Sequence, residues 1–418
     1  MWMYSLKFSL RSLARELLRN IWGRLFVYPA LLANERSHEA LAAYVARRAR
    51  KLGIDPDGVA KAPLLTKAQV KADPARFVRP RSLGTLCRNT IRTSGTSGSP
   101  LTLVQTLGTV VREEAFVYRQ LRWIGYRHGQ RRAWIRGDIV CAENPADGRY
   151  WCRDWIGNML MMSSYHLSNA TIGSYIDALE RFDPVVIQAY PSSIAALASW
   201  LNASGRRYQG GSLKGIMTSS ETLEPAVRAA VTEAFGVTVY DWYGQAERVA
   251  ALGTCEHGNY HLLPDYGMVE LLDRPDGSCE LVGTSLNNPA MPLVRYRTGD
   301  TVVPGDAPCP CGRVFPLVKA VIGRQEKIIT LPDGRIIARL DRVFQGIDRH
   351  LLEGQVLYRG DGKFTLRVVA GDGFGAADEA ALIDQFLLRV PGVQVAVERV
   401  DAIARGPNGK FEFIAVEA

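Results

Sequence analysis

The sequence contains no run of 18 uncharged apolar residues, and its most hydrophobic early stretch, 21–33, is interrupted by Arg24 and Pro29. Because a transmembrane helix needs about 20 predominantly apolar residues, no membrane-spanning segment is predicted. Internal repeats and low-complexity tracts are also absent. With 47% hydrophobic and 22% charged residues among 418, the composition excludes an intrinsically disordered or fibrous protein and leaves room for two or three folded domains.

Cysteine is scarce, and its odd count argues against a disulfide framework. The seven cysteines are Cys87, Cys141, Cys152, Cys255, Cys279, Cys309 and Cys311. The first 30 residues make a poor secretion signal, because basic residues run through their apolar part and no small-residue cleavage site follows. A cytoplasmic protein with reduced thiols is therefore expected.

Positive charge is concentrated in one third of the chain. Residues 1–150 carry 26 basic and 11 acidic side chains, whereas 151–323 carry 12 and 17, and 324–418 carry 13 and 14. Such a basic region is compatible with nucleic acid, a membrane surface or an anionic small molecule. Composition alone does not choose among these partners.

An amphipathic helix is predicted within residues 1–30. Five basic residues and the single acid Glu16 lie in this segment, with apolar residues between them at roughly helical spacing. The apolar residues that could share a face are Leu10, Leu13, Leu17, Leu18 and Ile21. We interpret the segment as a helix packed against its own domain, with contact to a lipid surface as the less favoured alternative.

From about residue 90 onward, strand-like apolar runs alternate with helical stretches, which predicts an α/β core. Helices are expected at 171–182, 192–201 and 225–235, and short strands at 185–189, 216–218 and 237–240. Ligand chemistry should then lie in the loops at the carboxyl ends of the strands. After Gly323 the pattern predicts a hairpin at 327–338, a helix near 341–352, two strands around Asp361-Gly362, a helix at 377–389 and a last strand at 393–400, hence a separate α+β domain.

The segment Thr93-Ser94-Gly95-Thr96-Ser97-Gly98-Ser99-Pro100 combines glycines with hydroxyl side chains. Glycine lets backbone N–H groups turn toward one point, and the hydroxyls add donors, so the segment could bind a polyphosphate. No Gly-Lys-Ser/Thr ends it, so it is not a Walker loop. A solvated Ser/Gly linker is the alternative from composition alone.

With this loop the sequence resembles the adenylate-forming enzymes, and within them the branch of phenylacetate–CoA ligase and the capsular-polysaccharide-type ligases. The family loop reads Thr-Ser-Gly-Thr-Thr-Gly-x-Pro, from which this chain departs only at Ser97. Further resemblances follow in order along the chain: Asp241-Trp242-Tyr243-Gly244-Gln245-Ala246-Glu247, Tyr296-Arg297-Thr298-Gly299-Asp300, the hinge-like Gly323-Arg324-Gln325-Glu326-Lys327-Ile328-Ile329, and Gly409-Lys410. The segments 189–192 and 218–222 resemble the same branch. The motifs occur in the order typical of the family across three quarters of the chain, and this shared order is more specific evidence for the resemblance than any single motif.

The resemblance implies a large multi-layered N-terminal adenylation domain at 1–322, a hinge at 323–326 centred on Glu326, and a smaller mobile C-terminal domain at 327–418. It implies Lys410 and Glu247 as catalytic residues, with Glu247 also coordinating Mg²⁺. The residues implied in binding ATP or AMP are Thr93, Ser94, Gly95, Thr96, Ser97, Gly98, Ser219, Ser220, Glu221, Tyr243, Gly244, Asp300 and Arg324. Tyr243 would lie against adenine, and Asp300 would accept hydrogen bonds from both ribose hydroxyls.

Three departures from the family pattern stand out. Ala246 replaces the threonine of the Tyr-Gly-x-Thr-Glu motif, Glu326 stands where the hinge residue is most often Asp, and residues 406–409 before Lys410 follow the pattern loosely. These departures bear on efficiency and alignment more than on the class of reaction.

Two short clusters of soft ligands predict a structural zinc site in the segment 255–311. Cys255, His257 and His261 precede Cys309-Pro310-Cys311 by about 50 residues, and three thiolates with one imidazole would close a tetrahedral site. Some members of the phenylacetate–CoA ligase branch carry zinc at this location, and His261 fits their spacing better than His257. Buried free cysteines are the alternative.

The resemblance implies an ATP-dependent, AMP-forming carboxylate ligase that uses Mg²⁺ and transfers the acyl group to coenzyme A. Tyr165, His166 and Tyr190 lie where the family builds its acyl pocket, and aromatic lining would suit an aromatic acid; a role in the core is equally compatible. Alternative acceptors are an amine, a hydroxyl or a carrier protein. An alternative from another functional class is a basic protein that binds nucleic acid or a membrane and has no catalytic activity. The favoured ligase interpretation predicts that the protein does not bind nucleic acid.

Overall fold

The computed structural model describes residues 2–82, 85–92, 101–142, 145–305, 308–322, 329–337, 340–344, 350–371, 373–404 and 413–417. The predicted phosphate loop (93–98), Arg324 and Glu326 of the predicted hinge, and Lys410 lie outside these residues. None of the described helices combines the length and apolar character that a bilayer-spanning segment requires.

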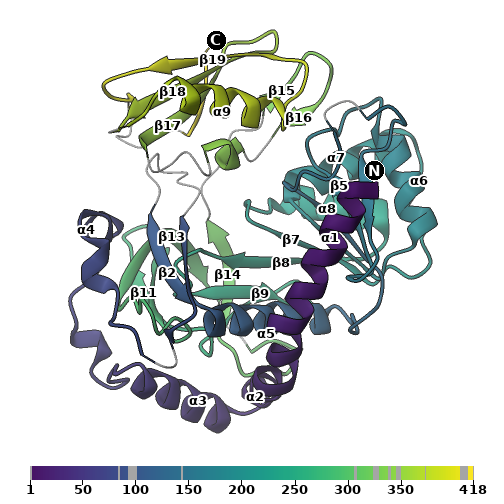
Figure 1. The fold of residues 1–418 in the computed structure, drawn as a ribbon. Helices are drawn as coiled ribbons and strands as arrows, with labels where there is room; N and C mark the ends of the chain where they lie inside the picture. Colours follow the sequence, from purple (N-terminus) through teal and green to yellow (C-terminus); the bar gives the residue numbers. More distant parts are fainter. Residues whose placement is uncertain are drawn as a thin grey trace.

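A mixed sheet of 12 strands organises the large part of the molecule (Figure 1). In spatial order its strands are β11 (Gly267–Asp273), β12 (Cys279–Ser285), β13 (Tyr296–Pro304), β14 (Leu317–Ile322), β10 (Tyr260–Leu262), β9 (Ala251–Thr254), β8 (Thr238–Gly244), β7 (Gly215–Ser219), β6 (Val186–Ala189), β3 (Arg132–Arg136), β5 (Met159–Ser163) and β4 (Trp151–Asp154). The strands β8, β7, β6, β3 and β5 run parallel, and the pairs elsewhere in this sheet are antiparallel.

Helices α6 (Ile172–Phe182), α7 (Pro191–Ala203) and α8 (Pro225–Phe235) connect the parallel strands. Their apolar faces and the strands form a core in which Ile176, Leu197 and Ile216 are fully buried. Proline opens α7 and α8, where its missing N–H costs no helical hydrogen bond. The helices and strands predicted between residues 171 and 240 are therefore confirmed, with boundary shifts of a few residues.

The region before β3 is mainly helical. Its elements are α1 (Trp2–Arg15), two π-helical turns (Glu16–Asn20 and Gly23–Val27), α2 (Tyr28–Asn34), α3 (His38–Lys51), a 3₁₀ turn (Val59–Lys61), α4 (Lys67–Ala72), another 3₁₀ turn (Pro74–Phe77), the hairpin β1 (Arg88–Arg92) and β2 (Thr102–Thr106), and α5 (Leu107–Trp123). Helix α1 packs against its own domain as predicted, but its contact is with strand β4 and its buried residues are Ser5, Phe8 and Ser9. The leucines expected to pack, such as Leu10 and Leu17, are exposed.

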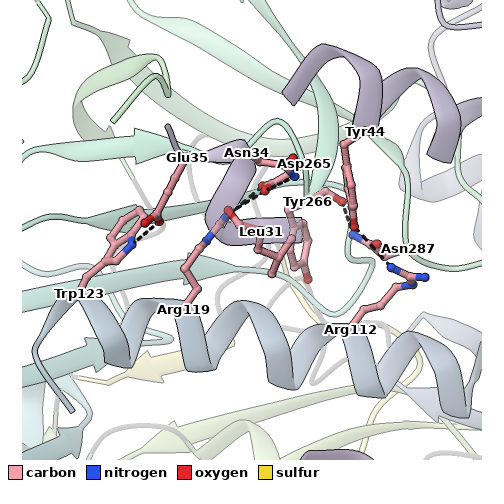
Figure 2. Close-up of polar contacts among 10 residues, drawn as sticks. All are labelled: Leu31, Asn34, Glu35, Tyr44, Arg112, Arg119, Trp123, Asp265, Tyr266 and Asn287. Atoms are coloured by element: carbon pink, nitrogen blue, oxygen red, sulfur yellow. Dashed lines mark hydrogen bonds and ion pairs between the residues drawn. The ribbon is translucent and has the colours of Figure 1, made fainter. Parts of the chain in front are cut away.

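A buried ion pair ties the helical region to the sheet (Figure 2). Arg119 of α5 donates from both terminal nitrogens to Asp265, which precedes β11, at 2.6 and 3.0 Å. Asn34 at the end of α2 donates to the same carboxylate at 3.1 Å, and Arg119 also reaches the Leu31 carbonyl oxygen. Both charged side chains are buried, and each has several hydrogen-bonding partners. A buried ion pair is stable only when its charges are paired and hydrogen-bonded in this way.

The C-terminal part forms a separate four-stranded sheet in the order β19 (Gln394–Arg399), β18 (Lys363–Ala370), β17 (Leu351–Tyr358) and β20 (Ile414–Val416). Helix α9 (Ala376–Leu387) packs on it, and a small hairpin of β15 (Ile329–Thr330) and β16 (Ile336–Ile337) precedes it (Figure 1). The backbone N–H of Ile336 donates to the Leu167 carbonyl oxygen at 3.4 Å, so this hairpin contacts the large part of the molecule. The fold is thus mixed α/β with a separate small α+β unit, as predicted.

Two predictions for this unit were wrong in detail. Where a helix was expected near 341–352, the described residues form a 3₁₀ segment at Leu340–Phe344, and β17 already begins at Leu351. Strand β17 pairs with both β18 and β20, and its Val356 lies in one apolar cluster with Leu382 and Phe386 of α9. The apolar residues from Leu351 onward therefore belong to a central strand that packs against a helix, and not to the end of a helix. The strand at 393–400 is not the last one, because β20 follows it; a strand of three residues carries too short a pattern to be recognised.

Candidate functional site

The predicted nucleotide-binding residues that the structure describes gather at the carboxyl ends of parallel strands. Ser219 ends β7, and Tyr243 and Gly244 end the neighbouring β8. Ser219 lies opposite Trp242 in register, which places the two strand ends side by side. Tyr190 follows β6 in the same way. This is the edge at which open α/β sheets bind ligands.

Tyr243 and Asp300 come together across 57 residues of sequence. The Tyr243 hydroxyl donates to Asp300 Oδ2 at 2.7 Å. Burial raises the pKa of Tyr243 well above its ordinary value, and the Asp300 charge adds to this shift. The phenol therefore stays protonated and is the donor, while the carboxylate is the acceptor.

An irregularity in β13 directs Asp300 toward this site. Residues 298–300 of β13 face Leu281 alone on β12, because the register passes from Val282↔Arg297 to Glu280↔Thr301. Thr298 Oγ1 donates to the Leu281 carbonyl oxygen at 2.8 Å and accepts the Asp300 N–H at 3.1 Å. Gly299 has φ +78°, a conformation that side-chain-bearing residues rarely adopt. Bulges of this kind redirect side chains next to functional sites.

The residues before the bulge hold neighbouring groups. The Tyr296 hydroxyl donates to Glu247 Oε1 at 3.0 Å. Arg297 donates to both oxygens of Glu280 at 2.8 and 2.6 Å, and these hydrogen bonds lower the pKa of Glu280. The predicted magnesium ligand Glu247 is thus fixed from the same strand that carries Asp300.

Glu221, one of the residues implied in nucleotide binding, accepts hydrogen bonds from a neighbouring loop. Its carboxylate accepts the Ser192 N–H at 2.9 Å and the Ser192 hydroxyl at 3.0 Å. Ser192 is in the first turn of α7, where free N–H groups and the helix dipole favour a carboxylate. Glu221 therefore links the loop after β7 to the loop after β6.

Ser220, next to Glu221, is in a strained backbone conformation with φ +74°. The Arg136 guanidinium donates to its hydroxyl at 2.5 Å and lies 4.9 Å from the centroid of the Tyr190 ring. Arg136 and Ser192 were not predicted as site residues. Ser192 lies in the recognised segment 189–192 and could have been found from it, whereas the only sequence signal for Arg136 is its place at the end of the basic stretch 122–136.

The three predicted acyl-pocket residues are buried. The Tyr165 hydroxyl donates to the Gly137 carbonyl oxygen at 3.2 Å, and His166 Nδ1 shares a hydrogen bond of 2.7 Å with Ser163. His166 also stacks on Tyr150 at 4.9 Å between centroids. These contacts give Tyr165 and His166 clear roles in packing.

A shallow, solvent-open pocket with a cavity volume of only about 10 Å³ lies beside them. Tyr190 is its only aromatic residue among those that the structure describes, and neither Tyr165 nor His166 lines it. The lining is mixed, with serine hydroxyls and aliphatic groups: Ser164, Leu167, Tyr190, Ser192, Ser193, Ala196 and Ile336. Ile336 belongs to the β15–β16 hairpin, so both parts of the molecule contribute to this pocket.

The four predicted metal-ligand side chains Cys255, His261, Cys309 and Cys311 converge. Their ligand atoms all lie within 4.8 Å of one another. The sulfurs of Cys255 and Cys309 are 3.6 Å apart, and Cys311 Sγ is 3.3 Å from His261 Nε2. His257, the alternative ligand, is exposed and outside the group.

Outer contacts orient these side chains. His261 Nδ1 lies 3.3 Å from the Phe315 carbonyl oxygen, so Nε2 is the nitrogen directed at the sulfurs. Asn259 Nδ2 donates to Cys309 Sγ at 3.3 Å. Burial lowers the pKa of His261 to about 4, so its imidazole is neutral near neutral pH. A carbonyl partner on the second ring nitrogen is the usual arrangement around metal-binding histidines.

Comparisons with known proteins find distant relatives among adenylate-forming enzymes. No family model matches the chain. Protein CapK of Staphylococcus aureus is 21% identical over 77% of this chain and 72% of its own length. A phenylacetate-coenzyme A ligase of Thermus thermophilus is 27% identical over 44% of each chain, so the match spans less than half of that enzyme.

Among solved structures, 2-hydroxyisobutyryl-CoA ligase in complex with 2-HIB-AMP and CoA matches with a TM-score of 0.50. The match covers 93% of this chain and 89% of that one at 17% identity. At this identity the likeness concerns the fold alone. It extends across both the large sheet and the small C-terminal unit.

Proposed function

Because the chain belongs to the superfamily of adenylate-forming enzymes, we propose that it is an ATP-dependent, AMP-forming ligase that activates a carboxylic acid and transfers the acyl group to coenzyme A. The Tyr243–Asp300 hydrogen bond carries this proposal. It joins two motifs from distant parts of the sequence at the carboxyl edge of the parallel strands. The aromatic residue proposed for the base and the carboxylate proposed for the ribose hydroxyls are joined there by a hydrogen bond of 2.7 Å between the Tyr243 hydroxyl and Asp300 Oδ2.

In the first step a carboxylate oxygen of the acid attacks the α-phosphorus of ATP. The bond to the β-phosphate oxygen breaks, and pyrophosphate leaves with the electron pair. In the second step the thiolate sulfur of coenzyme A attacks the acyl carbon, and AMP leaves. Both steps concentrate negative charge, so N–H donors and cations are the groups that the protein must supply.

The chain's own residues divide this work. Asp300 accepts hydrogen bonds from the ribose, and Tyr243 holds that carboxylate in place while its ring lies against the base. The loop 93–98 and Lys410 are proposed to bind the phosphates and the acid. Glu247, fixed by Tyr296, is the proposed ligand for Mg²⁺, which would neutralise charge on the phosphates.

We further propose that Cys255, His261, Cys309 and Cys311 hold a structural Zn²⁺. A tetrahedral site with Zn–S bonds of about 2.3 Å places its ligand atoms about 3.5–4 Å apart, close to the 3.6 and 3.3 Å found here. The site joins the end of β9, strand β10 and the segment before β14. It therefore stabilises the region between the Glu247 and Asp300 motifs and takes no part in the reaction.

The acid and the acceptor are less defined than the reaction class. An aromatic acid was expected, but the groups around the shallow pocket beside Tyr190 are mostly serine and aliphatic side chains, so small aliphatic acids are candidates as well as aromatic ones. Transfer to an amine, a hydroxyl or a carrier protein is the second candidate for the acceptor step, because the sequence also resembles the capsular-polysaccharide-type ligases.

Carboxylate-dependent ATP–pyrophosphate exchange tests the proposal. We expect exchange with at least one member of a panel of aromatic and small aliphatic acids, and its loss in Asp300→Asn and Lys410→Ala. Replacing the exposed Asp57 by Asn is the matched control and should leave exchange intact. Exchange that persists in Asp300→Asn, or that occurs with no acid of the panel, would overturn the proposal.

The proposed hinge has a separate test. Proline at position 326 restricts the backbone around which the C-terminal unit would turn between the two steps. Glu326→Pro should keep ATP–pyrophosphate exchange but lose acyl–CoA formation. If both activities persist unchanged, the hinge assignment is wrong.

A further inference from the structure

Exposed apolar side chains are concentrated at the start of the chain. Of the 17 large hydrophobic side chains that are exposed within the described residues, ten lie between residues 2 and 26. They are Trp2, Met3, Leu6, Leu10, Leu13, Leu17, Leu18, Trp22, Leu25 and Phe26, called here the N-terminal apolar face. Isolated exposed leucines are ordinary, but a continuous set of this size marks an interaction surface.

The way α1 docks explains why these side chains stay outside. Strand β4 is the edge of the large sheet and has backbone N–H groups without a neighbouring strand on its outer side. Ser5 Oγ accepts the Arg153 N–H at 3.1 Å, and Ser9 Oγ accepts the Trp155 N–H at 2.9 Å. Helix α1 thus covers the edge strand with serine hydroxyls, and its leucines are not needed for docking.

The N-terminal apolar face follows one side of a long helical segment. Trp2, Leu6, Leu10, Leu13 and Leu17 recur three or four residues apart, which aligns them on one face. The helical segment continues through the two π-helical turns, where Leu18, Trp22, Leu25 and Phe26 extend the surface. Figure 1 shows α1 running along the outside of the molecule.

Aromatic rings lie at both ends of this surface and beside it. The Trp22 and Phe26 rings stack at 5.6 Å, and Trp2 is 66% exposed. Trp155 and Ile156, in the turn after β4, are 52% and 54% exposed next to the docked helix. Tryptophan is enriched where an apolar phase meets water.

The exposed charges on α1 beside the N-terminal apolar face are basic. Lys7 and Arg11 are exposed, and Arg11 makes a long ion pair of 4.0 Å with Asp138 while its side chain stays 51% exposed. The single acid of the segment, Glu16, is already paired with Arg24 and accepts a hydrogen bond from Asn20. A partner with negative charge above an apolar layer would complement this arrangement. A second copy of the chain would instead bring its own Lys7 and Arg11 toward the same basic side chains.

We propose that the N-terminal apolar face docks on an anionic phospholipid bilayer. The leucines and tryptophans enter the boundary between headgroups and acyl chains, while Lys7 and Arg11 contact lipid phosphates. The helix lies in the plane of the membrane surface and does not cross it. This inference stands on the surface alone and is independent of the reaction proposed above.

Flotation of the full chain with phosphatidylcholine vesicles, with and without phosphatidylglycerol, tests the proposal. We expect binding that depends on the anionic lipid. Leu10→Asn/Leu13→Asn should lower the partition coefficient at least about tenfold, because two large apolar groups no longer enter the lipid. Lys7→Gln/Arg11→Gln should lower it about fivefold per charge on anionic vesicles only.

Matched substitutions separate docking from folding. Leu86→Asn/Leu388→Asn removes two exposed leucines elsewhere, and Arg50→Gln/Lys51→Gln removes two exposed charges from the end of α3; both should bind as the native chain does. Thermal unfolding should be unchanged in all four variants. The proposal is refuted if the native chain does not float with anionic vesicles. It is also refuted if the native chain binds no vesicles and light scattering shows that it is a dimer, which Leu10→Asn/Leu13→Asn converts to a monomer.

Discussion

The buried ion pair in Figure 2 should dominate the stability of the large part of the molecule. The side chains of Arg119 and Asp265 are 1% and 0% exposed, and two N–H groups meet two oxygens. The Arg119 guanidinium also lies 4.9 Å from the Phe315 ring centroid and 5.2 Å from that of Phe116. Replacing Arg119 by Leu leaves a buried carboxylate without its cation, which costs about 3–5 kcal/mol.

Asp265→Leu should cost a similar amount, because it leaves the guanidinium buried and unpaired. If the two losses were additive, Arg119→Leu/Asp265→Leu would cost about 6–10 kcal/mol. We expect only about 1–3 kcal/mol for the double variant, because no buried charge remains and the main loss is the acceptor of Asn34. The difference between the additive cost and the cost of the double variant is a coupling energy, and a large value shows that the two side chains interact directly.

Urea unfolding followed by circular dichroism measures these free energies, with attention to the transition of the large part because the small unit can unfold separately. The exposed pair Arg207–Glu233 has the same 2.6 Å separation, with side chains 47% and 62% exposed. Arg207→Leu should change stability by less than about 1 kcal/mol because water already solvates that pair. Single variants at the buried pair that cost as little as this control, or a double variant with additive cost, would refute the reasoning.

Three further outcomes are expected. Zinc should be present at about one equivalent in the native chain and fall below half in Cys309→Ser/Cys311→Ser, and retention of the metal in that variant would contradict the site. Tyr243→Phe should raise the KM for ATP about tenfold or more in the exchange assay, since a hydrogen bond to a charged group contributes about 1.5–3 kcal/mol; an unchanged KM would remove the pair from the nucleotide site. Glu221→Gln should weaken exchange only in part, because its amide oxygen can still accept a hydrogen bond from the start of α7. Glu221→Leu should abolish exchange, and equal activity of the two variants would contradict the bridging role of Glu221.

Much of the parallel sheet could be predicted because its elements have simple periodicities. The strand at 185–189 and the helices on either side of it differ from the structure by one or two residues at their ends, since apolar runs and helical spacing determine such units locally. The carboxyl-edge location of Tyr243 follows from the same pattern. Cys255, His261 and the two later cysteines could also be grouped, because ligand chemistry restricts which residues can share a site.

Other features depend on contacts that no local pattern encodes. The linkage of Glu221 to Ser192 joins two loops after neighbouring strands, and neither residue type indicates a partner 29 residues away. The face of α1 that packs was also predicted wrongly. Leucine spacing indicated a buried stripe, but the edge strand needs hydrogen-bond acceptors, and only Ser5 and Ser9 provide them there.

The segment 296–300 is a motif in which most residues determine the position of one functional side chain. Arg297 pairs with Glu280, Thr298 closes the bulge, and Gly299 adopts a positive φ. These three residues leave Asp300 facing Tyr243. Under the proposed function only Asp300 of the motif contacts the nucleotide. Its neighbours are required because the bulge changes the direction of the Asp300 side chain from the one that regular alternation between the two faces of the strand would give it. Substitutions at Thr298 or Gly299 should therefore impair ATP binding as Asp300→Asn does, although neither residue needs to touch the substrate.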